Sequence, residues 1–444
     1  MKSLCALLAT TLLLPLHAQE KNKIPATSLD TVLFDEGLWT KSLEDLQTAT
    51  KPAPEVIKQT GTGSVRRILK GMEWLSSAKD GLRADPESYQ LLGKKVGEVI
   101  VRGREGKAGE ATVSLFNRGD DGEIPAATYQ AKLKEWKGLL DEKLAVRSEV
   151  RNIQGAVALE GWVWKKGDTA VLLEGSMNRS EKRAEFIRLR FASISATKNA
   201  PTKMARRDSF AANVKKDDKG FTWVDGVPMV DQGQKGYCVV ASVERVARYF
   251  GANVDQHEMA QIANTGDSGT SGDDMEKAFQ RVTGKIHLRT LKHIDYDDKR
   301  AERDLRSYNT AAKKAGVKTI DIDTDAFYVD PRQFWFNAHK ETFRDMKRGQ
   351  QGYEHFERKV KEYVDQGIPL CWTLYLGMFP EKGLPQSYGG HMRLIIGYNF
   401  TSPDANEHQI YYTDSWGDGH EKKAMRADEA YCMTMAMYSM VPNK

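Results

Sequence analysis

Residues 230–251 read VDQGQKGYCVVASVERVARYFG, and this stretch contains the pattern that decides the fold. After Cys238 the apolar residues recur at the spacing of one helix face, at Val239, Val240, Val243, Val246, Ala247 and Phe250. Gly251 is a residue type at which helices commonly end. We therefore expect an amphipathic helix with Cys238 in its first turn. Free backbone N–H groups and the positive end of the helix dipole favour a thiolate there.

The residues that precede this helix carry a second pattern. Gln232, Gly233, Gly236 and Cys238 follow the order Q-G-x-x-G-x-C. This order resembles the nucleophile segment of papain-like cysteine peptidases. The resemblance implies that Cys238 is a catalytic nucleophile, that Gln232 lies beside it, and that Gly236 supports the segment.

Two later stretches resemble the same family. Gly390 and His391 lead into an apolar run, and residues 410–417 read IYYTDSWG. In papain-like enzymes a histidine at a strand start is followed, further along the chain, by an amide or acid before Ser-Trp-Gly. The resemblance assigns these places to His391 and Asp414, with Gly390 and Trp416 supporting the site or its substrate cleft. Family members usually have asparagine where this chain has Asp414.

Each of these residue types meets a need of acyl transfer. A thiol with a pKa near ~8.5 is mostly protonated at neutral pH and needs an imidazole to take its proton, which His391 would do. The imidazole needs an acceptor on its other side, which Asp414 would supply, and Trp416 could cover the pair from water. The oxyanion needs preorganised donors, which the Gln232 amide and the Cys238 backbone N–H would provide.

Some features depart from papain itself. Val239 follows the cysteine where papain has tryptophan, and Lys235 stands where many relatives have a disulfide cysteine. Residues 266–272 read GDSGTSG ahead of an expected helix at 273–282. This part more closely resembles bacterial peptidases that process double-glycine leaders, which belong to the same papain-like superfamily. The resemblance therefore implies a divergent, bacterial-type branch.

Other functions remain open on these residues alone. A cysteine within an apolar helical pattern is more often a small core residue than a nucleophile. The chain could be a non-catalytic binding or adhesion protein on a papain-like fold, although such a protein would be expected to have lost part of the catalytic set. The same residues could also serve an acyl transferase or an amidase, because a thioester does not dictate its acceptor.

The composition is that of a soluble globular protein. The chain has 444 residues, of which 40% are hydrophobic and 29% charged, and this length suits two domains. The net charge of +5 is small, and the basic residues are spread along the chain, so nucleic-acid binding is not indicated. The expected partner is a peptide or protein substrate, and the chemistry requires no metal or organic cofactor.

The first residues predict export. Residues 1–18 read MKSLCALLATTLLLPLHA, with a short basic region, an apolar core and a small residue at a plausible cleavage point. A membrane anchor is the rival, but the apolar run is shorter than the ~20 residues that span a bilayer. We expect a secreted or periplasmic protein without stable membrane insertion. Loss of Cys5 leaves Cys238, Cys371 and Cys432, of which the last two could pair or be buried thiols.

We expect three parts after the signal peptide at 1–18. Residues 19–195 would form an α+β accessory or pro-domain, residues 196–220 a basic linker, and residues 221–444 a two-lobed papain-like α+β domain with a helical and a β-rich lobe. The linker contains Arg206–Arg207, a pair that trypsin-like enzymes cleave when exposed. The first domain is therefore either a removable, inhibitory region or a permanent accessory domain, and the sequence leaves both open.

Periodicity predicts the main elements of both domains. We expect strands at 98–102 and 111–116, a helix at 128–144, a hairpin at 156–164 and 169–174, a helix at 353–363, a strand at 370–376 and a loop at 378–388 beside His391.

Overall fold

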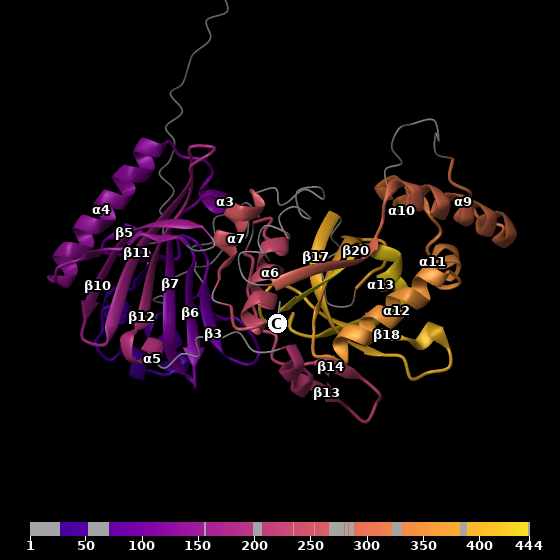
Figure 1. Cartoon of the computed structure of the whole chain (residues 1–444), viewed down its shortest axis with the longest axis horizontal. Helices are drawn as coiled ribbons and strands as arrows, with labels where there is room; N and C mark the ends of the chain where they lie inside the picture. The colour runs from indigo at the N-terminus through magenta and orange to yellow at the C-terminus, as the bar shows by residue number, and fades with distance from the viewer. Residues whose placement is uncertain are drawn as a thin grey trace, which may run out of the picture.

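The computed structural model describes residues 27–51, 71–154, 157–198, 207–233, 235–252, 254–265, 279, 283, 288–321, 331–381 and 389–442. Within these residues the chain is mixed α+β with three sheets, which confirms the predicted α+β class. Two large sheets lie on either side of the helices α6 (Cys238–Tyr249) and α7 (Gln256–Ala263), as Figure 1 shows. We call them the N-terminal sheet and the C-terminal sheet.

The N-terminal sheet is antiparallel, with the strand order β2-β3-β6-β7-β12-β11-β10-β8 and β9 paired to β10. Its strands are β2 (Glu73–Trp74), β3 (Gly81–Ala84), β6 (Val99–Arg104), β7 (Lys107–Asn117), β8 (Glu149–Val150), β9 (Ile153–Gln154), β10 (Ala158–Lys166), β11 (Thr169–Asn178) and β12 (Arg183–Ser193). These bounds confirm the strands and the hairpin predicted from the sequence.

The two faces of this sheet differ in chemistry. On one face apolar side chains such as Leu173 and Leu189 pack with the buried residues of α4 (Ala126–Leu144), the helix on the outer side of the sheet in Figure 1. The alternate residues point to the opposite face because side chains alternate along a strand. There Glu174 and Arg188 are buried and pair with each other. The second face is therefore a charged surface, and it lies toward α7.

Short elements complete the N-terminal part. A third sheet contains β1 (Thr27–Ser28), β4 (Tyr89–Leu91) and β5 (Lys94–Lys95). The helical segments are α1 (Asp30–Leu33), η1 (Leu38–Thr40), α2 (Leu43–Ala49), α3 (Arg118–Asp121) and α5 (Ile194–Lys198). Of these, α3 follows β7 directly and carries Asp120 toward the charged side of the sheet.

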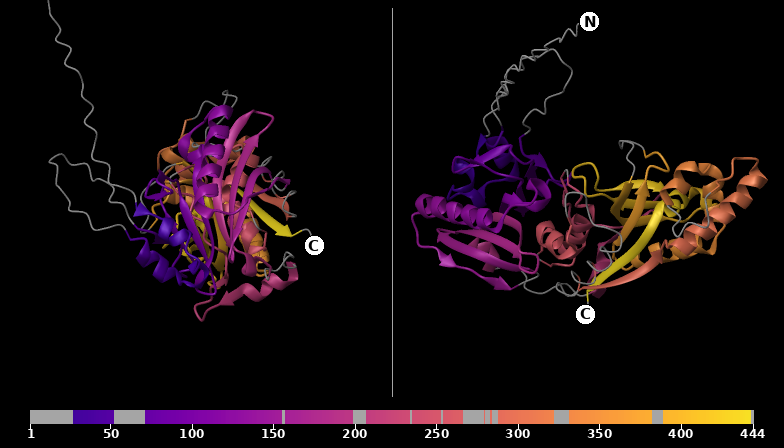
Figure 2. Two further views of the ribbon diagram at one scale, coloured as in Figure 1. Left: turned by 90° about the vertical axis from the view of Figure 1, so that its left-hand side faces the viewer. Right: turned by 90° about the horizontal axis from the view of Figure 1, so that it is seen from above.

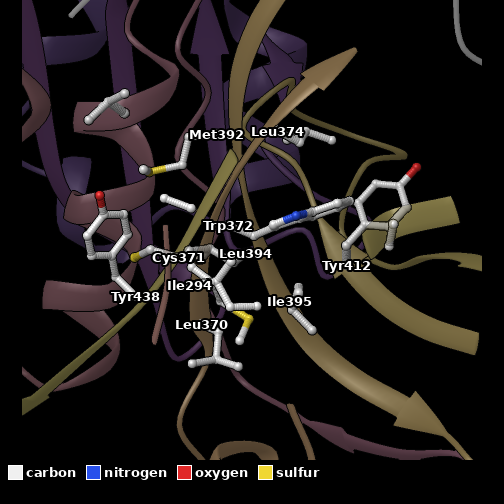
Figure 3. Close-up of a cluster of buried hydrophobic side chains, with 14 of the residues drawn as sticks. Ile294, Leu370, Cys371, Trp372, Leu374, Met392, Leu394, Ile395, Tyr412 and Tyr438 are labelled. Atoms are coloured by element: carbon white, nitrogen blue, oxygen red, sulfur yellow. The ribbon is translucent and has the colours of Figure 1, made fainter. Parts of the chain in front are cut away.

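The C-terminal sheet has the order β13-β14-β17-β16-β20-β15, and β18 joins β17 to β19. Its strands are β13 (Val214–Lys216), β14 (Thr222–Val224), β15 (Leu288–Asp295), β16 (Leu370–Leu376), β17 (Gly389–Asn399), β18 (Gln409–Thr413), β19 (Lys423–Arg426) and β20 (Thr434–Pro442). Figure 3 shows the apolar core on β16 and β17, with Trp372 and Tyr412 side by side. This core fixes the strands that carry the candidate histidine.

Helices cover the C-terminal sheet, as the two further views in Figure 2 show. They are α9 (Asp298–Ala315), α10 (Pro331–Asn337), α11 (Lys340–Arg348), α12 (Gln351–Val364) and α13 (Ala427–Met433), with the short turns η2 (Arg207–Asn213) and η3 (Ala405–Glu407). The helix predicted at 353–363 and the strand predicted at 370–376 are confirmed by α12 and β16. None of the described helices has the length and apolar character required to cross a membrane.

Several predictions concern segments outside the described residues. The signal peptide, residues 266–272 and most of the helix predicted at 273–282 fall in this category. Residues 196–198 of the predicted linker end α5, and from residue 207 the linker forms η2 and β13, where Phe210 packs edge-on against Phe250 of the C-terminal part. The two-lobed arrangement and the separate N-terminal domain remain predictions.

Cys371 and Cys432 are free, buried thiols rather than a disulfide pair. Burial raises the pKa of the Cys371 thiol to about 12 and that of Cys432 further still. Both are therefore uncharged core residues at physiological pH. Cys238, the remaining described cysteine, is partly exposed.

Candidate active site

Cys238 is the first residue of α6, as the helical periodicity predicted. The Tyr237 side chain makes no capping hydrogen bond to the helix, so the N–H groups of the first turn have no side-chain partner from the N-cap. Those N–H groups and the positive end of the helix dipole face the region of the Cys238 sulfur and favour negative charge there. The structure therefore presents this partly exposed thiol at a helix end.

His391 and Asp414 are brought together by the strands of the C-terminal sheet. His391 is the third residue of β17 and pairs with Leu374 of β16, and Asp414 follows the last residue of β18. The His391 Nε2 lies 2.7 Å from Asp414 Oδ1. The backbone N–H of Ser415 donates to the same carboxylate oxygen at 2.7 Å. Since Nε2 bonds the carboxylate, Nδ1 is the ring nitrogen available to Cys238.

The electrostatics of this pair favour a charged imidazole. Burial lowers the pKa of His391, but the Asp414 carboxylate and a hydrogen bond with Cys238 outweigh burial and raise the pKa to about 9. Burial raises the pKa of Asp414, whereas His391 and Arg393 lower it to about 2. Asp414 is therefore ionised, and His391 can hold a proton, over the whole neutral range.

Arg393, which was not among the predicted site residues, holds the other oxygen of Asp414. Its Nε donates to Asp414 Oδ2 at 2.7 Å, and its Nη1 donates to both Glu381 oxygens, at 3.0 and 2.8 Å. The Arg393 side chain has no exposed surface. A charged residue two positions after His391, on the same strand face and inside an apolar run, was the available signal.

Arg245 links the nucleophile helix to the segment that carries Asp414. It lies seven residues after Cys238, on the same face of α6. Its Nη1 donates to the Asp414 carbonyl at 2.8 Å, its Nη2 to Thr413 Oγ1 at 2.5 Å and its Nε to the Pro228 carbonyl at 2.8 Å. This buried guanidinium fixes the distance between the two elements that supply Cys238 and Asp414. Arg245 was not among the predicted site residues.

Gln232 lies in the loop before α6 with a defined amide orientation. Its Oε1 accepts a hydrogen bond from Ser415 Oγ at 2.7 Å, and its Nε2 donates to the Lys235 carbonyl at 3.1 Å. Its backbone N–H donates to the Ser415 carbonyl at 2.9 Å. One Nε2 hydrogen remains beyond these bonds, since an amide nitrogen carries two. Ser415, the residue that follows Asp414, thus connects Gln232 to the segment that carries this carboxylate.

Trp416 lies against the ring of the candidate histidine. The Trp416 and His391 rings are stacked, with centroids 4.6 Å apart and planes 28° apart. A cavity of about 420 Å³ reaches this tryptophan and also Asp231, the neighbour of Gln232. Trp74, Arg83 and Asp85 of the N-terminal part line the same cavity. Both large parts of the chain therefore contribute to the space beside the site.

The two predicted glycines lie in β17 and in the loop before α6. Gly390 is exposed in β17, and a side chain there would meet no atom within 4 Å. Gly236 lies in the bend between Lys235 and Tyr237. Within the part of the chain that the structure describes, no group of three or more histidine, cysteine or acidic side chains is arranged to hold a metal ion.

The geometry of these residues suits nucleophilic chemistry. An imidazole lies between a thiol at a helix start and a buried, ionised carboxylate, and an oriented amide lies in the adjoining loop. Such a set can pass a proton from sulfur to a leaving group and can stabilise an oxyanion. All four predicted catalytic residues thus lie in one region of the molecule.

Two family models match this region of the chain. The Peptidase C39 family matches residues 226–301, which include Gln232 and Cys238, and the Peptidase_C39 like family matches residues 305–438, which include His391 and Asp414. Both are papain-like cysteine peptidase families related to double-glycine leader peptidases, as the sequence resemblance indicated. No curated protein matches the chain.

Proposed function

We propose that this chain, whose matched regions resemble papain-like cysteine peptidase families, is an exported peptidase that hydrolyses peptide bonds through Cys238, His391 and Asp414. The observation that carries the proposal is the hydrogen-bonded relay from Cys238 through His391 to the buried Asp414 carboxylate. The N-terminal residues 1–18, with the pattern of a secretory signal, support export.

The proposed reaction starts from a thiolate–imidazolium pair, because the raised pKa of His391 lets this imidazole keep the proton taken from Cys238 at neutral pH. The thiolate attacks the carbonyl carbon of the scissile peptide bond, and the oxygen that becomes negative accepts hydrogen bonds from the Cys238 backbone N–H and the Gln232 side chain. His391 then donates its proton to the leaving amine, which breaks the C–N bond and leaves a thioester. Asp414 stabilises the imidazolium while it exists.

Hydrolysis of the thioester uses the same residues in reverse roles. His391, now neutral, takes a proton from water, and the hydroxide so formed attacks the thioester carbonyl. The C–S bond breaks, the peptide carboxylate leaves, and Cys238 and His391 return to their first state. Trp416 stacks on the imidazole throughout and limits the access of bulk water to the His391–Asp414 hydrogen bond.

The direct test is intact-mass analysis after brief treatment with a low concentration of a peptidyl epoxide. We expect one adduct on Cys238 of the wild-type protein, none with Cys238→Ala, and a large loss of labelling with His391→Ala. The buried thiols Cys371 and Cys432 serve as internal controls because they are uncharged and inaccessible. Labelling of Cys238 that is as slow as that of an unfolded thiol would overturn the peptidase proposal in favour of a binding protein.

A further inference from the structure

The loop that precedes Cys238 contains a buried cation. The Lys235 side chain is only 2% exposed, and its Nζ lies 2.8 Å from Asp120 Oδ2 and 3.9 Å from Glu98 Oε2. Asp120 belongs to α3, and Glu98 directly precedes β6. Both carboxylates come from the N-terminal part of the chain. A lysine three residues before the nucleophile is therefore held by side chains more than a hundred positions away.

Tyr237, the residue directly before Cys238, is held by the same structure. Its Oη donates to Asn117 Oδ1 at 3.2 Å, and Asn117 Nδ2 donates to Asp120 Oδ2 at 2.8 Å. A Cβ added to Gly119 would lie 2.4 Å from the Tyr237 Oη. The start of α3 thus packs so closely on Tyr237 that only a glycine fits between them.

The beginning of the loop is also tied to the N-terminal sheet. Arg83 Nε donates to Glu98 Oε1 at 2.6 Å, and its Nη1 lies 3.5 Å from Asp231 Oδ2. Asp231 Oδ1 accepts the Gly233 backbone N–H at 2.8 Å. Gly233 has a φ of +71° and lies against Arg83, so the backbone conformation required there favours glycine.

Glu98 joins the two ends of the loop through its charge. Burial raises the pKa of this carboxyl, but Lys235 and Arg83 outweigh burial and lower the pKa to about 2. Glu98 is therefore ionised at any pH at which the site would work. The Glu98 carboxylate therefore attracts two cations, Lys235 in the loop and Arg83, which contacts the beginning of the loop through Asp231.

The contacts that hold Lys235 affect the candidate active site through the Lys235 carbonyl. The Lys235 carbonyl accepts the hydrogen bond from Gln232 Nε2 at 3.1 Å, and this bond directs the amide that would bind the oxyanion. We infer that Lys235, anchored by Asp120 and Glu98, is a positioning residue for the oxyanion-binding amide. We infer also that the N-terminal part is a permanent component of the catalytic unit. This inference rests on the proposed function.

Other contacts across the same surface support a permanent association. Arg188 Nη2 lies 2.7 Å from Glu258 Oε1 of α7, and Arg118 Nη2 donates to the Thr265 carbonyl at 2.7 Å. Phe186 and Leu159 of the N-terminal strands are buried in the apolar cluster of the C-terminal part. Removal of the N-terminal part would expose that cluster to water as well as release the loop.

The test compares two reactions of Cys238 in the full-length protein with Lys235→Met. Acylation by an N-acyl amino-acid 4-nitrophenyl ester forms an oxyanion and needs the Gln232 amide, whereas alkylation by iodoacetamide forms none and needs only the thiolate. We expect Lys235→Met to slow acylation by about 10- to 100-fold, below the loss for a whole oxyanion donor, and to change alkylation little. Lys235→Arg, which keeps the cation, should recover part of the acylation rate.

A matched control and a milder variant keep the test decisive. Lys165→Met removes an exposed ion pair with Glu149 and should leave both rates unchanged. If Lys235→Met does not fold, Asp120→Asn keeps Lys235 beside Glu98 and should show a smaller, equally selective loss of acylation. Equal loss of both rates, or loss of neither, would overturn the positioning role. Absence of His391-dependent labelling in the wild-type protein would instead overturn the proposed function.

Discussion

The two sides of the candidate site are held in place by different kinds of interaction. On the histidine side, His391 lies in a strand ladder opposite Leu374, and the apolar core of the C-terminal sheet packs beneath it. On the glutamine side, residues 231–237 form a loop that is tied by Lys235 and Asp231 to charged groups of the N-terminal part. We call these the histidine side and the glutamine side.

The geometry of the histidine side is determined by neighbouring strands, whereas the geometry of the glutamine side depends on side chains far away in the sequence. The register of β16 and β17 places His391 through main-chain hydrogen bonds and core packing, which depend on neighbouring strands. The glutamine side depends on side chains such as Asp120, which is 115 residues from Lys235 in the sequence. Substitutions in the N-terminal part should therefore affect the glutamine side while leaving the histidine side intact.

The largest expected effect is on kcat/KM, and it should differ between the two sides because His391 transfers protons whereas Gln232 binds the oxyanion. His391→Ala should lower kcat/KM by on the order of 10⁴-fold or more, because no imidazole then takes the proton of Cys238 or donates a proton to the leaving amine. Gln232→Ala should lower it by only about 10²- to 10³-fold, because the Cys238 backbone N–H still binds the oxyanion. Steady-state kinetics on one peptide substrate measures both. His339→Ala, which removes an exposed imidazole, is the control.

Equal losses of kcat/KM for His391→Ala and Gln232→Ala would contradict the proposed difference between the two sides. That outcome would mean that the loop amide is as necessary as the imidazole, and that the backbone N–H alone gives no stabilisation. A loss with Gln232→Ala that is confined to KM would place the amide in substrate binding rather than in transition-state stabilisation.

The next largest effect concerns the stability of the histidine side. Arg393→Met should lower the free energy of unfolding by about 3–5 kcal/mol, because it leaves the buried Asp414 carboxylate and the partly buried Glu381 carboxylate without their shared cation. Arg306→Met removes an exposed pair with Glu302 within α9 and should cost less than about 1 kcal/mol. Denaturant unfolding followed by tryptophan fluorescence measures both, and similar values would contradict the buried role.

A smaller effect concerns the pH profile. His391 has a raised pKa of about 9, so its imidazolium should persist up to that pH and kcat/KM should fall as the pH rises through it. Asp414→Asn removes the charge that raises this pKa and leaves burial, which lowers it. We expect the alkaline limb to move down by about 1 to 3 pH units. Asparagine is also the residue that papain-like relatives usually have here.

The pH profile of kcat/KM on one peptide substrate provides the measurement. Asp404→Asn, a change at an exposed carboxylate, should leave the alkaline limb in place. An unchanged limb in Asp414→Asn would mean that His391 does not set it.

The histidine side was predictable from the sequence because its signals are local. Cys238 heads a helix whose apolar period is visible in the sequence, and His391 and Asp414 each adjoin an apolar strand. Arg393 was missed, although a charge within an apolar run marks a buried pair. Strand period also revealed most of the N-terminal sheet, because its apolar residues alternate along β11 and β12.

Gln232 itself was predicted from the sequence, but the contacts that anchor its loop were not, because alternation reveals only which residues share a strand face. The charged residues Glu174 and Arg188 alternate with apolar ones, a pattern typical of strands with one face in water. In the structure that charged face is buried against α7, where Arg188 pairs with Glu258. Nothing local in Lys235 indicates that Asp120 and Glu98 will be its partners, since only the packing of distant elements brings them together.

The smallest expected effect tests whether the glutamine side needs a continuous chain. A recognition site for a specific protease, inserted between residues 199 and 206, would allow the N-terminal part to be cut from the C-terminal part. Because ion pairs and buried apolar residues join the two parts, we expect the pieces to elute together in gel filtration. The rate of Cys238 acylation should change little, since Asp120 would still hold Lys235.

An inhibitory N-terminal part predicts the reverse, with separation of the pieces and faster labelling of Cys238. A cut protein that separates and loses acylation, but keeps alkylation, would show that the loop needs the N-terminal part and that the interface needs the covalent link.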